Sequence, residues 1–469
     1  MKAFFYSFAL LAASFMAIGQ PGTLDATFNP GSGANNEYVR RIIVQPDGKI
    51  LASGAFTQFN GQNKPYLVRL NADGSIDESF NIGTGFNNPI GDIALQSDGK
   101  IVVGGSFSSF NGSAANYIVR LNPDGSRDDS FSSGIGPNGS IGCIALAPDG
   151  RIYISGNFSM FDNVQRLRIA CLSSSGSLLT SFDPLGGLDG LIYGMKVQPD
   201  GKIVAGGTFT SYNNLPAGRI VRILPSGLPD PGFDPGTAVP SLYQYLINSI
   251  SLQEDGKIIA AGVFNSFNNQ TVKNIVRLMP NGQLDANFNP PVFNDQIESA
   301  VSLPNGKIAV VGRFTSGSSI SRNRVAGLNS DGTMDMNFNP GTGASAITYV
   351  VTPYGSNKLM IGGFFTTYNG TSRGRIARIN AESFTNLPET CHNEAVASVQ
   401  WINSTNLLKI SPNSNEIVKV LIYNAEGQMV HSQSTSGQTE IHLDKLHDGV
   451  YCFVLQGNQQ YQKSRFMKF

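Results

Sequence analysis

The sequence predicts an all-β protein, in which a seven-bladed β-propeller of four-stranded blades is followed by a small immunoglobulin-like β-sandwich. Three observations lead to this prediction. The composition is typical of strands and tight turns, one short stretch recurs at a nearly constant spacing, and one repeat unit is divided between the two ends of the repeated region.

The composition favours strands. Of the 469 residues, 41% are hydrophobic, 14% are charged and 53 are glycine. Such a chain is typical of many short strands joined by turns, rather than of helices or disorder. The 33 Lys and Arg residues balance the 33 Asp and Glu residues. Because positive charge is not in excess, we expect neither nucleic acid nor anionic lipid as a partner.

The stretch Gln-Pro-Asp-Gly-Lys-Ile at residues 45–50 recurs along the chain. Successive central glycines are 51, 51, 51, 55, 50 and 49 residues apart. A repeat of this length predicts an array of similar structural units. The central glycines are Gly48, Gly99, Gly150, Gly201, Gly256, Gly306 and, in a degenerate copy, Gly355.

Each copy predicts four antiparallel strands. In the first copy, Asp47-Gly48 and Asp73-Gly74 are hairpin turns, and the expected strands cover residues 38–45, 50–56, 66–71 and 75–80. Such a small sheet cannot bury both of its faces, so the copies must pack against one another, and radial packing of four-stranded sheets makes a propeller.

One repeat is split between the two ends of the array. Residues 21–28 reproduce the pattern of residues 73–80, whereas the last repeat stops after its third strand at Asn380. We therefore expect the N-terminal strand to complete the last blade, because closure of the ring removes exposed sheet edges. Seven blades follow from this count.

An Arg in the third strand of a copy is accompanied by an Asp in the fourth strand. The two residue types disappear together in the third copy, as Cys171 and Leu179, whereas the copy with Gly327 retains Asp335. We interpret them as structural ion pairs between neighbouring strands, with a ring of ligand-binding arginines as the alternative. The expected pairs are Arg69–Asp77, Arg120–Asp128, Arg222–Asp230, Arg277–Asp285 and Arg378–Asp25.

The repeat is similar to a known family. The 45–50 stretch, the Gly54-x-Phe56 motif, the Val68–Ser75 stretch and the Asp77-x-x-Phe80 motif resemble the delta-60 repeat of bacterial β-propellers. The resemblance covers roughly residues 20–385 and recurs about seven times. It implies a propeller and brings no catalytic residues with it.

The C-terminal region has a different pattern. Apolar and polar residues alternate as in short strands. Three segments follow in order: a strand and turn with the pattern Val420-x-Ile422-Tyr423-Asn424-x-x-Gly427, a strand with the pattern Leu446-x-x-Gly449-Val450-Tyr451, and a basic tail. This order is similar to the C-terminal (Por) sorting domain of the type IX secretion system, although Trp401-Ile402-Asn403-Ser404 replaces its usual Tyr-Pro-Asn-Pro opening. The resemblance implies the secretion machinery as a partner. An accessory sandwich that itself binds a ligand is the alternative.

The N-terminus predicts a signal peptide. Lys2, an apolar run from Phe4 to Phe15 and the Ala17-Ile18-Gly19 sequence have the order of a cleaved leader, and the apolar run is too short for a membrane anchor. We therefore expect a signal peptide at 1–19, a propeller at 20–385, a linker at 386–399 and a sorting domain at 400–469. The mature chain would be secreted or displayed on the outer-membrane surface, without a transmembrane segment, as a monomer.

The propeller offers few groups for catalysis or metal binding. All four His residues follow residue 385, which excludes a His-dependent triad or a His-ligated metal in the ring. The spacing of Asn71, Asp73 and Asp77 resembles a calcium-binding turn, but the Asp73 position becomes Ser or Asn in other copies. We expect no cofactor, with calcium as the alternative. Cys143 and Cys171 are expected in the core, and Cys391 and Cys452 could form a disulfide.

The binding hypothesis rests on the loops. Both Asp-Gly turns of a blade lie on one face, so the longer linkers gather on the other face, where propellers usually bind ligands. We expect Tyr243 and Tyr245, in the longest repeat interval, to be exposed there for stacking on a sugar or peptide. Glu37 and Glu298 are acids outside the repeat pattern, near the starts of inner strands. The predicted function is a glycan- or protein-binding or scaffolding module, and the alternative is a carbohydrate-active lyase or hydrolase that uses Glu, Asp, Tyr or Arg at the channel mouth.

Overall fold

The computed structural model describes residues 19–382, except 36 and 241–244, and the C-terminal segments 397–402, 407–412, 418–424, 429–443, 449–456 and 461–468. The predicted signal peptide, apart from its last residue, lies outside the described residues. In the described part of the chain, no helix is long and apolar enough to cross a membrane.

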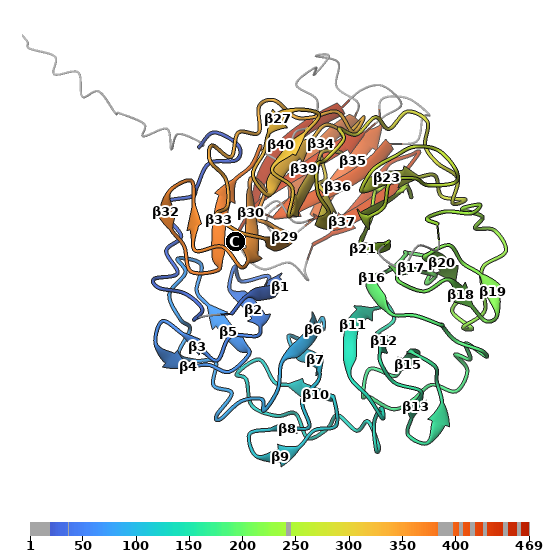
Figure 1. Ribbon diagram of the computed structural model, residues 1–469. Coiled ribbons are helices and arrows are strands. Elements are labelled where there is room, and N and C mark those ends of the chain that lie inside the picture. Colours follow the sequence, from blue (N-terminus) through green and yellow to red (C-terminus); the bar gives the residue numbers. More distant parts are fainter. Residues whose placement is uncertain are drawn as a thin grey trace, which may run out of the picture.

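Seven similar sheets form a closed ring around a central axis (Figure 1). Each sheet has an inner, a middle and an outer strand, paired antiparallel in that order. The strands are β1 (Val39–Val44), β2 (Ile50–Gly54) and β5 (Leu67–Leu70) in blade 1; β6 (Ile90–Leu95), β7 (Ile101–Gly105) and β10 (Ile118–Leu121) in blade 2; β11 (Ile141–Leu146), β12 (Ile152–Gly156) and β15 (Ile169–Leu172) in blade 3; β16 (Ile192–Val197), β17 (Ile203–Gly207) and β20 (Ile220–Ile223) in blade 4; β21 (Leu246–Leu252), β22 (Ile258–Val263) and β23 (Ile275–Leu278) in blade 5; β24 (Ile297–Ser302), β25 (Ile308–Gly312) and β28 (Val325–Leu328) in blade 6; and β29 (Thr348–Tyr354), β30 (Lys358–Gly363) and β33 (Ile376–Asn380) in blade 7.

The fourth segment of each blade is shorter than a regular strand. In blade 1 it forms one bridge, between Leu70 and Ile76, and a backbone bond from Asp77 to Arg69. The chain then turns, because the Asp77 carboxylate accepts hydrogen bonds from the Ser79 amide and hydroxyl. The predicted fourth strand is therefore present only as a single bridge to the third strand, and a turn follows it.

A short hairpin that the sequence analysis did not include joins the middle and outer strands. In blade 1, Asn60 and Gly61 at its tip have φ values of +51° and +75°, which suit a two-residue hairpin turn. The hairpins are β3–β4 (Gln58–Phe59 and Gln62–Asn63), β8–β9 (Ser109–Phe110 and Ser113–Ala114), β13–β14 (Met160–Phe161 and Val164–Gln165), β18–β19 (Ser211–Tyr212 and Leu215–Pro216), β26–β27 (Ser316–Gly317 and Ile320–Ser321) and β31–β32 (Thr367–Tyr368 and Thr371–Ser372).

The core lies between neighbouring blades. Phe56 and Phe59 of blade 1 are fully buried in one cluster with Met360 and Ile376 of blade 7. Phe107 and Phe110 of blade 2 belong to a cluster that includes Leu51 of blade 1. The repeated aromatic residues thus pack one sheet onto the next, which stabilises the ring through the hydrophobic effect.

The N-terminal segment completes blade 7, as predicted. Leu24 bridges Ile379, and backbone bonds join Gly22 to Asn380, Asp25 to Arg378 and Asn380 to Thr23. The two ends of the array therefore close the ring, and no outer edge of blade 7 is left unpaired in this stretch.

The C-terminal region forms two antiparallel sheets. Leu408, Ile410 and Ile441 of one sheet share a buried cluster with Val420 and Ile422 of the other. The first sheet contains β34 (Ala397–Ile402), β35 (Leu407–Pro412) and β38 (Thr439–His442), and the second contains β37 (Met429–Thr435), β36 (Val418–Asn424), β39 (Gly449–Gln456) and β40 (Tyr461–Lys468). Cys391 and the side chain of Cys452 lie outside the described residues, and so does their suggested disulfide.

Candidate functional site

The two faces of the ring differ in the segments that form them. The first residue of β2, Ile50, pairs with the last residue of β5, Leu70, so the turns at 45–49 and 71–75 lie side by side. We call the face with these turns, and their equivalents in other blades, the short-turn face. The opposite face carries the linkers between blades, such as residues 81–89, and we call it the loop face.

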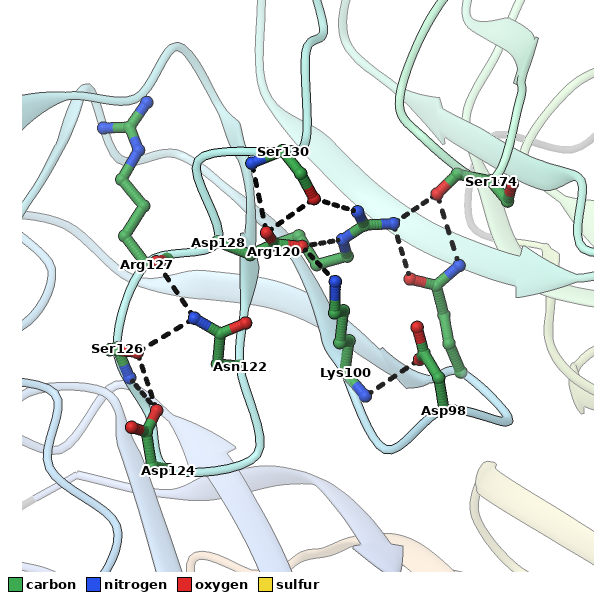
Figure 2. Close-up of polar contacts among 11 residues, drawn as sticks. Asp98, Lys100, Arg120, Asn122, Asp124, Ser126, Arg127, Asp128, Ser130 and Ser174 are labelled. Carbon is green, nitrogen blue, oxygen red and sulfur yellow. Dashed lines mark hydrogen bonds and ion pairs between the residues drawn. The ribbon is translucent and has the colours of Figure 1, made fainter.

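Each arginine–aspartate pair is part of a polar network on the short-turn side, and Figure 2 shows the network of blade 2. In blade 2, Arg120 Nε lies 2.6 Å from Asp128 Oδ2, and Lys100 Nζ lies 3.0 Å from the same oxygen. Arg120 Nη1 also donates to the carbonyl of Ser174 in blade 3. One buried carboxylate therefore holds the arginine that connects two blades.

The same arrangement recurs in four other blades. Each guanidinium donates to a turn carbonyl of the next blade, and each carboxylate also contacts a lysine that follows an Asp-Gly turn, or its counterpart Lys358 in blade 7. The Arg–Asp distances are 2.7 Å for Arg69–Asp77, 2.7 Å for Arg222–Asp230, 2.8 Å for Arg277–Asp285 and 2.6 Å for Arg378–Asp25. The lysines are Lys49, Lys202, Lys257 and Lys358.

The lysine is the member of this network that the sequence analysis missed. Its signal was present, because Lys49 and most of its equivalents directly follow the recurring Asp-Gly turn. Burial by itself raises the pKa of Asp77, but hydrogen bonds from Ser79, Lys49 and Arg69 outweigh it and hold the pKa well below the ordinary value. The carboxylate therefore remains charged and paired at neutral pH.

Two blades lack the arginine for different reasons. In blade 6 the position is Gly327, where an added Cβ would lie 2.8 Å from Phe338, and Asp335 pairs with Lys307 instead. In blade 3, Cys171 is fully buried beside Tyr153. Packing thus takes the place of the arginine at these two positions, and blade 6 keeps an ion pair through Lys307.

A second connection between blades lies on the loop face. The residue before the outer strand has a positive φ in every blade, from +63° at Tyr117 to +73° at Arg375. In five blades its side chain donates to a linker carbonyl of the next blade. These bonds are Arg168–Leu188 (2.7 Å), Arg219–Pro240 (3.2 Å), Asn274–Asp295 (2.9 Å), Arg324–Ala344 (2.8 Å) and Arg375–Glu37 (2.7 Å).

The short-turn face also contains a hollow of about 570 Å³ between blades 5 and 6, lined by residues that include Lys257, Arg277 and Asp331. Its two cations belong to the structural network, since Lys257 and Arg277 both contact Asp285. Its Asp331 carboxylate accepts hydrogen bonds from Thr333 within its own turn. Within the described residues, no three His, Cys, Asp or Glu side chains are grouped as a metal site would require. This face is therefore occupied by repeated structural contacts.

The predicted tyrosines do not form an exposed pair. Tyr245 is only 6% exposed and packs in a cluster with Val239, Phe264 and Phe267, so the prediction that it is exposed for stacking is wrong. Tyr245 directly precedes β21, and the hydrophobic effect draws it into the space between blades 4 and 5. Tyr243 lies outside the described residues.

The predicted acids are both at the loop face. Glu37 is exposed, and its backbone carbonyl accepts the bond from Arg375. Glu298 is the second residue of β24, and its Oε1 lies 2.9 Å from Arg313 Nε and 2.6 Å from Gln296 Nε2. The side chain of Glu298 is 12% exposed, whereas that of Arg313 is 43% exposed. Glu298 therefore takes part through its carboxylate, in an ion pair with Arg313, whereas Glu37 takes part through its backbone carbonyl.

Every inner strand has a β-bulge at its second residue from the loop face, or at the third residue in β21. The register between inner and middle strands shifts there in all seven blades, for example between Val39 and Arg41. Bulges re-aim side chains and are frequent beside functional sites. We call these residues the bulge ring: Arg40, Gly91, Gly142, Tyr193, Asn248, Glu298 and Tyr349.

Three aromatic rings and several charges meet on one side of the bulge ring. The Tyr38 ring lies 5.2 Å from that of Tyr349 and 6.3 Å from that of Phe364. Arg40 lies over Tyr349, with 5.9 Å between the guanidinium carbon and the ring centroid. We define the mouth cluster as Tyr38, Arg40, Glu298, Arg313, Tyr349 and Phe364.

The mouth cluster is accessible and electrostatically coupled. Phe364 is 38% exposed, and it is the one aromatic residue among the exposed large hydrophobic side chains of the described residues. Burial and the Glu298 carboxylate raise the pKa of Tyr349, while Arg313 and Arg40 oppose this shift. The cluster therefore presents neutral aromatic faces beside guanidinium and carboxylate groups.

The mouth cluster breaks the repeat. The bulge-ring residues are Arg, Gly, Gly, Tyr, Asn, Glu and Tyr in chain order, whereas the structural network on the short-turn side is nearly constant. Sequence reasoning missed the cluster because Tyr38 and Tyr349 are brought together only by closure of the ring. The variation between aligned copies was the signal that could have identified it.

Comparisons with known proteins agree with this architecture. The family model described as "Domain of unknown function (DUF5122) beta-propeller" matches residues 45–80, 96–131, 147–182, 198–233, 253–288, 303–338 and 355–383. The model described as "Secretion system C-terminal sorting domain" matches residues 404–468. No curated protein matches the chain significantly.

Two solved structures are similar at low identity. The extracellular domain of a hybrid two-component system from B. thetaiotaomicron is 12% identical with a TM-score of 0.47, and the match covers 94% of this chain and 57% of that one. PorZ, a surface component of the type IX secretion system of Porphyromonas gingivalis, is 11% identical with a TM-score of 0.31, and the match covers 92% of this chain and 51% of that one. The chain thus spans little more than half the length of either protein.

Proposed function

Since the chain belongs to the family described as a domain of unknown function (DUF5122) beta-propeller and ends in a secretion system C-terminal sorting domain, we propose that it is an extracellular module that binds a glycan at the mouth cluster. The sorting domain implies export to the cell surface or secretion. The type IX secretion machinery is the corresponding partner for export.

The observation that supports this site most directly is the break in the repeat at the bulge ring. A residue that stabilises every blade recurs in every blade, as the Arg69–Asp77 type of pair nearly does. A residue that binds an asymmetric ligand has no reason to recur. The bulge ring combines such variation with bulges that direct its residues, and ligands of propellers usually meet this face.

The side chains of the mouth cluster match a sugar ligand in chemical type. Aromatic faces stack on the apolar faces of sugar rings, and Glu298 and Arg313 offer an acceptor and donors for hydroxyl groups. An enzyme would require bond cleavage in addition to this binding. Release of reducing ends from a bound polysaccharide, abolished by Glu298→Gln, would assign the lyase or hydrolase alternative instead.

The test is a glycan array probed with the purified full chain. We expect binding that the Tyr38→Ser/Tyr349→Ser/Phe364→Ser variant loses. The control is Met336→Ser, which removes a side chain that is 63% exposed in the fourth segment of blade 6, away from the cluster. Absence of glycan binding by the wild-type chain, or binding that the triple variant retains, would refute the proposed site.

The remaining expectations are part of the same proposal. We place the propeller at 20–385, the linker at 386–399 and the sorting domain at 400–469, and we expect the exported propeller to act as a monomer. Light scattering of the purified chain measures the oligomeric state.

A further inference from the structure

Arg40 differs from Arg313, the other cation of the mouth cluster, in having no carboxylate partner among the described residues. It is half-buried on β1, and it forms no ion pair with any residue in the described part of the chain. Its neighbour Arg41 lies 2.9 Å from Asp92, and Arg313 lies 2.9 Å from Glu298. Arg40 instead contacts the ring of Tyr349, so its charge is not neutralised by a carboxylate.

The bulge ring carries no side chain on the blade 2 side of Arg40. The two following members are Gly91 and Gly142. A Cβ added to Gly91 would lie 2.3 Å from the Ile141 carbonyl oxygen of blade 3, whereas a Cβ added to Gly142 would meet no atom within 4 Å. The opposite side of Arg40 is occupied by Tyr349 of blade 7. The guanidinium therefore lies between an aromatic ring and a stretch of the bulge ring that is bare of side chains.

We infer that the mouth cluster recognises an acidic sugar and that Arg40 binds the carboxylate of a uronic acid residue. This inference rests on the proposed glycan-binding function. A uronic acid combines the two features that the cluster would bind, a ring with apolar faces and a carboxylate. Arg can hold a carboxylate through two parallel hydrogen bonds, which makes the contact strong and directional. Tyr349 and Phe364 supply the aromatic faces, and Glu298 and Arg313 supply partners for hydroxyl groups.

Glu298 gives the site a preferred orientation for the acid. Its carboxylate neutralises Arg313, so Arg40 is the cation of the mouth cluster that no carboxylate of the described residues pairs with. The ligand acid is therefore directed toward Arg40 on blade 1. An uncharged sugar would gain nothing from this separation of charges.

The experiment measures binding of three uronic acid polymers of different stereochemistry to the full chain, each compared with its methyl ester. The ester keeps the sugar ring and removes the charge. We expect at least one acidic polymer to bind about tenfold or more tightly than its ester, and Arg40→Gln to weaken binding of the acid by about tenfold while leaving binding of the ester unchanged. Arg127→Gln, in the fourth segment of blade 2, is the control and should change neither.

The outcomes separate the inference from the proposed function. Equal binding of acid and ester, or loss of both in Arg40→Gln, overturns the acidic specificity and leaves glycan binding in place. Binding of neutral glycans without binding of any uronic acid polymer would also overturn the acidic specificity and leave glycan binding in place. If neither the uronic acids nor any glycan on the array binds, the inference and the proposed function both fail.

Discussion

Asp128 shows how a single carboxylate can hold two blades together. Its Oδ2 contacts Arg120 and Lys100, and Arg120 reaches the turn of blade 3 (Figure 2). The Arg120 and Asp128 side chains are 7% and 8% exposed. Loss of the carboxylate would leave a buried guanidinium without its counter-charge, which is more costly than loss of a surface pair.

We predict that Asp128→Asn lowers the free energy of unfolding by about 2–4 kcal/mol, because the variant leaves Arg120 buried and unneutralised. Urea unfolding followed by circular dichroism measures the change. The matched control is Asp129→Asn, whose carboxylate is 92% exposed and should matter by less than about 0.5 kcal/mol. Equal effects of the two substitutions would show that the network is energetically neutral.

The same carboxylates predict the acid sensitivity of the ring. Burial raises the pKa values of Asp25, Asp77 and Asp128, but hydrogen bonds from Lys, Ser or Thr, and Arg side chains outweigh it, so each pKa lies below that of the unfolded chain. Their stabilisation is complete above the unfolded pKa of about 4 and is lost as the pH falls toward the folded values.

We therefore expect the melting temperature to fall steeply when the pH is lowered from about 4 to 3, with little contribution from these groups between about pH 5 and 8. Calorimetry at a series of pH values checks this. Asp128→Asn should show a shallower dependence than the wild-type chain. If the melting temperature of the variant depends on pH as steeply as that of the wild-type chain, Asp128 does not contribute to the acid sensitivity.

At the level of the blade, the constant and variable parts of the repeat have different roles. The Asp-Gly turns and the alternating strands were sufficient to predict the sheets, because turn chemistry and hydrophobic alternation are local properties. The fourth strand was predicted as longer than it is, since the Asp77 side chain caps its own turn and competes with strand pairing. The prediction that Tyr245 is exposed was wrong, because burial of its ring between two blades is more favourable than exposure in the loop.

Gly327 provides a test of packing within one blade. Replacement by Ala would place a Cβ 2.8 Å from Phe338, which fills the place that arginine takes in other blades. We predict that Gly327→Ala destabilises the protein by about 1–3 kcal/mol through overpacking. Thermal unfolding measures the effect, with Gly142→Ala as the control because no atom lies within 4 Å of its added Cβ. A neutral Gly327→Ala would mean that Phe338 can move away without cost.

At the level of the whole ring, the two kinds of connection complement each other. The junctions that lack the buried arginine, after blades 3 and 6, are held on the loop face by Arg168 and Arg324. The junction between blades 7 and 1 has both kinds, Arg378 and Arg375. In the described residues, each junction therefore has at least one arginine that connects two blades.

This arrangement predicts where the ring opens locally. We expect Arg324→Gln to increase hydrogen exchange in β28 and in the linker at 340–346, because no second arginine holds that junction. Arg375→Gln should have a smaller effect on β33, since Arg378 still connects blades 7 and 1. Exchange measured by mass spectrometry on both variants decides this. Similar increases in both would contradict the idea that the second connection compensates.

Ring closure explains what could not be predicted about the candidate site. The split repeat was enough to predict closure, but the side chains that closure brings together lie in the first and last blades of the array, as Tyr38 and Tyr349 do. No local pattern connects them. The sequence placed Glu298 near the start of an inner strand, and it is the second residue of β24, whereas its partner Arg313 and the aromatic rings required the assembled ring.

The most direct test of the central claim is hydrogen exchange of the full chain with and without the glycan that the array selects. Binding at the mouth cluster predicts protection at residues 37–40, 297–300, 348–350 and 363–365, with no change at the turns 45–49 and 71–75. Protection confined to the turns of the short-turn face, with none at the bulge ring, would contradict it.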